Sequence, residues 1–229
     1  MSTNSYAVKK ERYNKEKSLH SGSAAGLRTA ESDRVRRITM IGILMGMNVA
    51  LCAFGVPVPG GHLYLNDVVI CTAALLMDAP AAFLIGGVGA MVGDMIFYPV
   101  AMFVSLFAHG LQAAAISLIY HRLSGRHHAA GSGTGSSGIG RSGTGRSESG
   151  RSVSGRSGTG RKAAAIAATL VGAVIMVTGY TLGKIYVYST FEYAMIKLPY
   201  EIAQALLGVV VSVSLCFRGR LMEYYERFR

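Results

Sequence analysis

The sequence predicts an all-α membrane protein of six transmembrane helices, with both termini on the cytoplasmic side. Of its 229 residues, 51% are hydrophobic and 15% are charged, whereas soluble domains carry about 25% charged residues. Long stretches such as residues 163–183 hold no charge, as expected where lipid is the solvent. All but two of the 23 Lys and Arg lie in residues 1–37, 122–162 and 218–229, which the positive-inside rule places in the cytoplasm.

The six expected spans are residues 38–57, 67–77, 79–98, 100–120, 163–185 and 198–217. Residues 68–91 could instead form one helix with Asp78 in mid-bilayer. A turn at Asp78 and Pro80 is favoured, because six spans keep the Arg-rich segment inside with both termini and five do not. The turn also spares Asp78 a cost of about 3 kcal/mol at the bilayer centre. The second helix is then short.

The expected organisation is a cytoplasmic tail at 1–37, helices one to four in 38–121, a loop at 122–160, helices five and six in 161–217 and a cytoplasmic tail at 218–229. The loop is almost wholly Gly, Ser, Thr and Arg, with an Arg every five residues from Arg141 to Arg161. It has no apolar face to bury, which predicts a disordered cytoplasmic tether. Contact of the Arg side chains with anionic lipid or RNA is the alternative.

Several function classes are excluded by residue placement. The net charge of +11 reflects membrane topology and not nucleic-acid binding, because the basic residues flank the apolar runs. Cys52, Cys71 and Cys216 stand singly without ligand spacing, so neither a disulfide nor a metal site is expected. No cleavable signal peptide is evident in residues 1–37. Residues 179–184 lack the phosphate-loop spacing, and no catalytic constellation appears. We expect a protein that is not an enzyme and needs no cofactor.

Polar side chains gather at the ends of the spans opposite the basic segments. Three pairs are spaced three or four residues apart, so each pair shares a helix face. We expect them to line a cavity that is open to the outside and binds a substrate. The candidate residues are His62, Tyr64, Asn66, Asp94, Tyr98, His109, Gln112, Tyr180, Lys184, Glu201 and Gln204.

Structural interpretations of the same residues stay open. Lys184 and Glu201 could simply pair with each other, and His109 with Gln112 could make a helix-to-helix hydrogen bond. Tyrosines 186, 188 and 193 are assigned mostly to an interfacial aromatic belt.

Small residues recur at four-residue spacing in the first span, at Gly42, Gly46 and Ala50. Such a stripe lets another helix approach closely, and the partner is either within the chain or another subunit. Gly87, Gly89 and Gly93 miss the dinucleotide-binding spacing and are interpreted as close-packing residues of the third span.

Four stretches together resemble the S component of energy-coupling-factor (ECF) vitamin transporters, over about residues 35–220 without the Gly/Ser/Arg loop. They are Val56-Pro-Val-Pro-Gly-Gly-His-Leu-Tyr-Leu-Asn-Asp67, Gly86-Gly-Val-Gly-Ala-Met-Val-Gly-Asp94, Tyr98-Pro99 and His109-Gly-Leu-Gln112. The Asp94, Tyr98 and His109–Gln112 pattern is most similar to the branch for pyridoxine- or hydroxymethylpyrimidine-type substrates.

The resemblance implies a multi-pass protein of the bacterial cell membrane that captures a water-soluble vitamin or precursor from outside. It implies docking of Gly42, Gly46 and Ala50 against a transmembrane scaffold subunit, although the family more often has Ala there. Two cytoplasmic ATPases would then supply the energy. The alternatives are a stand-alone secondary carrier or channel for a small metabolite, which the lack of duplicated halves disfavours, and a structural or signalling protein that works through its Arg repeat.

Overall fold

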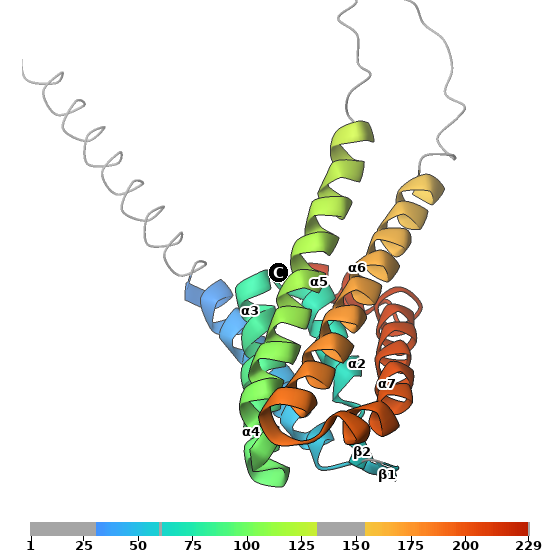
Figure 1. Ribbon diagram of the computed structural model, residues 1–229. Helices are drawn as coiled ribbons and strands as arrows, with labels where there is room; N and C mark the ends of the chain where they lie inside the picture. The colour runs from blue at the N-terminus through green and yellow to red at the C-terminus, as the bar shows by residue number, and fades with distance from the viewer. Residues whose placement is uncertain (1–30, 60, 132–153, 229) are drawn as a thin grey trace, which may run out of the picture. The chain divides into compact units, whose positions relative to one another are not determined.

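The computed structural model describes residues 31–59, 61–131 and 154–228 (Figure 1). It divides into two units, residues 1–42 with Arg229 and residues 43–228. The first described helix, Glu31–Cys52, contains the boundary between them. The described residues of the larger unit are mostly helical and include one short β-hairpin.

Among the described residues, five helices are long and apolar enough to cross a membrane: Glu31–Cys52, Ala79–Phe97, Pro99–Ser124, Thr159–Tyr188 and Phe191–Phe217. A sixth apolar helix, α2 (Asn66–Leu76), has only 11 residues. At 1.5 Å per residue it extends about 16 Å, roughly half the thickness of a bilayer core. The helical membrane architecture is as expected, but the structure holds five full-length candidates where six spans were predicted.

The short helix α2 is the most enclosed part of the bundle. Ten of its 11 residues are buried, and it packs against α5 (Met102–Gly131) and α7 (Phe191–Phe217). Because it presents almost no surface to lipid, its length need not match the thickness of the bilayer.

The first span was predicted to continue to residue 57, and this is wrong. The helix ends at Cys52, and β1 (Val56–Val58) pairs antiparallel with β2 (Gly61–Leu63), Val56 opposite Leu63. Pro57 and Pro59 explain the change, because proline lacks an N–H and pushes the preceding residue into extended backbone. The hairpin leads directly into α2.

The expected turn at Asp78 is present. Helix α2 ends at Leu76, and α3 (Ala79–Phe83) begins after Asp78 with Pro80 in its first turn, where the missing N–H of proline costs nothing. The segment continues through a π-helix, η1 (Leu84–Val88), into α4 (Gly89–Phe97).

Glycines of η1 and α4 allow close helix contacts, which confirms the packing interpretation. A Cβ on Gly87 would lie 2.7 Å from the carbonyl oxygen of Leu106 on α5. A Cβ on Gly89 would lie 2.7 Å from Nδ2 of Asn48 on the first helix, and that amide donates to the carbonyl oxygen of Ile85 at 2.7 Å. These glycines therefore let the backbone of the α3–α4 segment approach the first helix and α5 closely.

The remaining elements are a 3₁₀ turn η2 (Pro99–Ala101), α5, α6 (Ser154–Gly183), a π-helix η3 (Lys184–Tyr188), α7 and α8 (Leu221–Phe228). The predicted loop 122–160 is helical at both ends, up to Gly131 and from Ser154, since extending a formed helix costs far less than nucleating one. Residues 132–153 of that loop lie outside the described residues.

The last span begins at Phe191 and not at residue 198. Thr190 caps it by accepting a hydrogen bond from the N–H of Tyr193 at 3.4 Å, and Glu192 lies in the first turn. Pro199 thus lies inside the helix. Figure 1 shows the hairpin, the end of α4, the end of α6 and the start of α7 at the same end of the bundle, which we call the hairpin end.

Candidate functional site

A cavity at the hairpin end gathers polar and aromatic side chains from the hairpin, α2 and the helices around it. It contains about 630 Å³ of empty space, a volume that includes open solvent. Its lining consists of His62, Tyr64, Asn66, Asp94, Tyr98, Ala101, His109, Met176, Tyr180, Lys184, Tyr188, Tyr193, Lys197, Glu201 and Gln204.

Ten of the eleven residues expected to bind substrate line this cavity: His62, Tyr64, Asn66, Asp94, Tyr98, His109, Tyr180, Lys184, Glu201 and Gln204. Gln112 is the exception. It is 1% exposed and lies behind His109, with its Oε1 2.8 Å from Nδ1 of that ring. The structure thus brings together residues that lie up to 142 positions apart, from His62 to Gln204.

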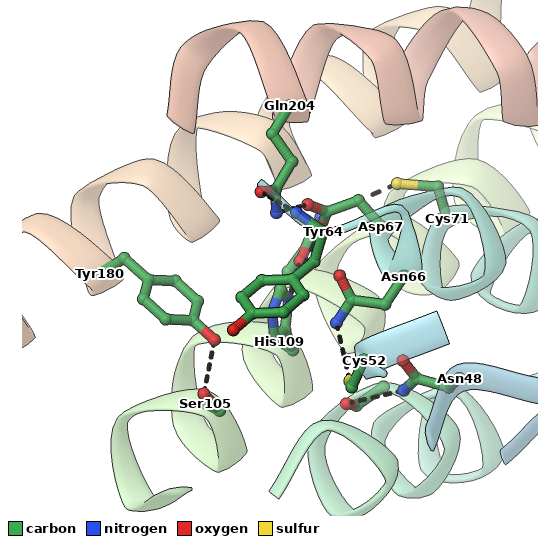
Figure 2. Close-up of polar contacts among 12 residues, drawn as sticks. Asn48, Cys52, Tyr64, Asn66, Asp67, Cys71, Ser105, His109, Tyr180 and Gln204 are labelled. Atoms are coloured by element: carbon green, nitrogen blue, oxygen red, sulfur yellow. Dashed lines mark hydrogen bonds and ion pairs between the residues drawn. The ribbon is translucent and has the colours of Figure 1, made fainter. Parts of the chain in front are cut away.

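A buried carboxylate, Asp67, joins three elements beneath the cavity (Figure 2). Asp67 is 1% exposed. Its Oδ1 accepts from Nε2 of Gln112 at 3.1 Å, and its Oδ2 accepts from Nε2 of Gln204. Nδ1 of His109 lies 3.6 Å from Oδ1. Asp67 therefore connects α2 with α5 and α7 through donors that compensate its burial.

Gln204 also connects α7 to the chain that follows the hairpin. Its Oε1 accepts from the backbone N–H of Tyr64 at 2.9 Å. Burial raises the pKa of the Tyr64 hydroxyl to about 12, with the charge of Asp94 acting in the same direction. Tyr64 therefore keeps its proton at physiological pH and can act as both donor and acceptor in the cavity.

A second chain of hydrogen bonds crosses from α4 to α6. The hydroxyl of Ser105 on α5 donates to Oδ2 of Asp94. The same hydroxyl is hydrogen-bonded to the hydroxyl of Tyr180 (Figure 2). The ring of Tyr180 meets His109 edge to face, with ring centroids 5.1 Å apart. Tyr180 thus connects this chain to the network around Asp67.

Lys184 and Glu201 form an ion pair, as one of the two sequence interpretations anticipated. Both side chains are buried, at 1% and 3% exposed, and Nζ of Lys184 lies 5.6 Å from the centre of the Tyr180 ring. Lys184 begins the π-helix η3, a local widening often found at functional sites. The pair lies in the wall of the cavity, so a structural and a ligand-binding role are compatible.

The three tyrosines assigned to an interfacial belt divide into two groups. Tyr186 is 80% exposed, as expected for a belt residue. Tyr188 and Tyr193 line the cavity, and Tyr188 meets Tyr98 edge to face at 6.1 Å between ring centroids. Tyr186 and Tyr188 both lie on the π-helix η3, but only Tyr188 faces the cavity. The regular spacing of an α-helix could not predict this difference in orientation.

Asn66 carries an unsatisfied acceptor in the cavity wall. The residue is 4% exposed, and its amide nitrogen lies 3.6 Å from Sγ of Cys52. Within the described part of the chain, its Oδ1 has no hydrogen-bond partner. A buried acceptor without a partner costs free energy, so a bound ligand that donates to it would gain affinity.

Sequence reasoning missed several contributors. Lys197, Met176 and Ala101 line the cavity, while Asp67 and Ser105 hold lining residues from behind. A signal existed for two of them, because Ser105 precedes His109 by four residues and Lys197 precedes Glu201 by four, which places each pair on one helix face.

The small-residue stripe of the first helix is exposed at Gly46 and Ala50. Among the residues that the structure describes, no heavy atom lies within 4 Å of a Cβ built on Gly46. Gly42 precedes them by one helical turn on the same helix. This face differs from the Gly87 and Gly89 contacts, where the available space is filled.

Comparison with known proteins gives one family match. Residues 32–137 match the family model described as ECF-type riboflavin transporter, S component. A search of curated proteins found no match. The matched residues include most of the first helix, the hairpin, α2, the α3–α4 segment and α5. The match confirms the resemblance found in the sequence: over residues 32–137, this membrane protein is similar to the S components of ECF transporters.

Proposed function

We propose that the chain captures a heterocyclic vitamin or vitamin precursor in the cavity at the hairpin end and delivers it as the S component of an ATP-driven ECF importer. The hairpin end faces the outside in this proposal, and both termini lie in the cytoplasm. The exposed stripe of Gly42, Gly46 and Ala50 docks against the transmembrane scaffold subunit, and two cytoplasmic ATPases supply the energy.

The chemistry of the cavity is the observation that carries the proposal. Tyr64, Tyr98, Tyr180, Tyr188 and Tyr193 supply aromatic surface for a planar ring, and such surfaces favour stacked or edge-to-face contacts. Donors and acceptors on His109, Asn66, Asp94 and Lys197 surround that aromatic surface. This combination suits a water-soluble heterocycle with polar substituents better than an inorganic ion or a lipid.

Two substrate types have support. Riboflavin is the substrate in the name of the matched family. The pattern of Asp94, Tyr98 and His109 with Gln112 resembles the pyridoxine or hydroxymethylpyrimidine branch. Riboflavin, pyridoxine and hydroxymethylpyrimidine share a flat ring with hydrogen-bonding groups on its edge. The chemistry of the cavity therefore supports this class of heterocycle, and a binding titration decides between the three molecules.

The experiment is to purify the chain in detergent and identify any co-purified small molecule by mass spectrometry. Calorimetric titration with riboflavin, pyridoxine and hydroxymethylpyrimidine should then give tight binding to one of them. His109→Ala and Gln112→Ala should each weaken binding by about 10-fold or more, because the variant leaves a polar group without its partner.

Tyr188 and Tyr186 offer a matched pair for the same titration. Tyr188→Ala should weaken binding, because Tyr188 lines the cavity, whereas Tyr186→Ala should leave the affinity unchanged, because Tyr186 is exposed. Absence of binding to any water-soluble vitamin would contradict the proposal. Uptake into liposomes by the chain alone, driven by an ion gradient, would instead favour a stand-alone carrier.

A further inference from the structure

The orientation of the Gln204 amide is fixed by a backbone group. The N–H of Tyr64 can only donate, and the side-chain atom 2.9 Å from it must therefore be the oxygen of Gln204. The amide nitrogen of Gln204 then faces Oδ2 of Asp67 and donates to it. Oδ2 of Asp67 is therefore an acceptor, and this conclusion needs no assumption about the protonation of the Asp67 side chain.

The orientation of the Gln112 amide follows from the other oxygen of Asp67. As a carboxylate, Asp67 can only accept, so the group 3.1 Å from Oδ1 is the amide nitrogen of Gln112. The oxygen of Gln112 must then point to Nδ1 of His109, 2.8 Å away. An amide oxygen can only accept, so Nδ1 of His109 carries a proton.

The second ring nitrogen of His109 is left for the cavity. His109 lines the cavity, and Nε2 makes no hydrogen bond within the described residues. A neutral imidazole with its proton on Nδ1 has a lone pair on Nε2. We infer that Asp67, acting through Gln112, sets the tautomer of His109 so that Nε2 offers a hydrogen-bond acceptor to the substrate.

This inference rests on the proposed function and specifies the substrate group at one position. The group that meets His109 must be a donor, such as an imide N–H, an aromatic amine or a hydroxyl. A carbonyl oxygen or an unprotonated ring nitrogen there would place two acceptors against each other. Methylation of the donor on a bound ligand should lower the affinity about 10-fold or more. Asp67 does not line the cavity itself and is therefore a positioning residue.

The tautomer can be measured without a ligand. Nitrogen-15 NMR of the histidine-labelled chain in detergent at about pH 8 should show His109 with its proton on Nδ1. His121, on the same helix, is the internal control, because its Nε2 lies 3.2 Å from the carbonyl oxygen of Met77 and must donate to it. His109→Gln and His121→Gln assign the two signals. A proton on Nε2 of His109, or on both nitrogens, would overturn the inference.

Asp67→Asn should reverse the tautomer. Gln204 still needs an acceptor, so the new side chain turns its oxygen to Gln204 and its amide nitrogen to Gln112. Gln112 then turns its own nitrogen toward His109, and the proton of His109 moves to Nε2. His121 should keep its signal. Unchanged nitrogen shifts of His109 in a folded variant would contradict the relay, and the wild-type spectrum remains decisive should the variant not fold.

The ligand-free spectrum separates this inference from the proposed function. With the predicted tautomer and no vitamin bound, the relay stands and the importer proposal fails. With a vitamin bound tightly and the opposite tautomer in the spectrum, the proposed function stands and the role of Asp67 is rejected. With both confirmed, Asp67→Asn should bind the vitamin about 10-fold or more weakly.

Discussion

Two stretches of the chain build the cavity, and they contribute different chemistry. Residues 32–137, which match the family model, supply Asn66, Asp94 and His109 and the buried anchor Asp67. The stretch after residue 137 supplies Tyr180, the Lys184–Glu201 ion pair, Tyr188, Lys197 and Gln204. The family match therefore covers one part of the cavity wall, and the other part, with both lysines, lies outside the match.

The matched and the unmatched stretch also differ in the roles of their residues. The matched stretch holds the exposed stripe of the first helix, which we propose serves assembly, and the helix contacts at Gly87 and Gly89, which serve the architecture. The unmatched stretch carries the cavity cations, and cations decide which polar substituents a ligand can present. In the proposed function, the choice of substrate therefore depends in part on residues beyond the match.

The largest expected effect comes from breaking the ion pair of the unmatched wall. Glu201→Gln removes the partner of a Lys184 that is 1% exposed, and an uncompensated buried charge costs about 3–5 kcal/mol. Lys184→Met should cost a comparable amount. The double variant Lys184→Met/Glu201→Leu should recover most of the stability, because a well-packed apolar pair can replace a buried ion pair.

Thermal unfolding of the four proteins in detergent measures this coupling. A double variant whose stability loss equals the sum of the two single losses would show that the two charges do not depend on each other. Titration of the double variant then separates stability from binding. A folded double variant that has lost affinity would give the pair a role in binding the ligand as well.

We expect an effect of intermediate size on stability at Gly87, where neighbouring atoms leave no room for a side chain, and none at Gly46, where there is room. Gly87→Ala places a methyl group 2.7 Å from the carbonyl oxygen of Leu106, which should destabilise the bundle by about 1–3 kcal/mol through overpacking. Gly46→Leu faces open space, so it should leave folding and ligand binding unchanged and block assembly with the scaffold subunit. Gly42→Leu should behave like Gly46→Leu.

Pull-down of the scaffold subunit, together with ligand titration, checks this pair of glycines. Retained assembly in Gly46→Leu would exclude the stripe as the docking face. A loss of ligand binding in Gly46→Leu would show that the stripe supports the fold, as Gly87 does.

Much of the architecture could be predicted because the free-energy cost of placing polar groups in lipid outweighs other contributions. Apolar runs and the turn at Asp78 and Pro80 follow from the cost of placing charge and free backbone groups in lipid. The hairpin could not be read from the apolar run, because Val56 and Val58 fit a helix and a strand equally well by hydropathy. The start of α7 was predicted at residue 198, although Thr190 and Glu192 provide an earlier N-terminal signal.

The candidate site was predictable to the extent that its residues are polar exceptions within apolar segments. Such exceptions are expensive in lipid and therefore tend to meet, which is why ten of the eleven expected residues surround one cavity. The role of Asp67 was not predictable, because it depends on the directions of two amide groups on other helices. Spacing along one helix carries no information about those directions.

The smallest effect is expected from the Arg repeat, which lies after the matched residues and far in sequence from both cavity walls. Replacing Arg141, Arg146 and Arg151 by Ser should leave vitamin affinity and transport within about twofold of wild type, because the proposed mechanism uses none of these side chains. Uptake by vesicles that contain the complete transporter measures this, with ligand titration of the same variant as the control. A loss of uptake with unchanged affinity would assign the repeat to delivery or to contact with anionic lipid, since removal of three positive charges weakens such contact by about 1 kcal/mol each. The unmatched stretch would then contribute to transport twice, once through the cavity cations and once through the loop.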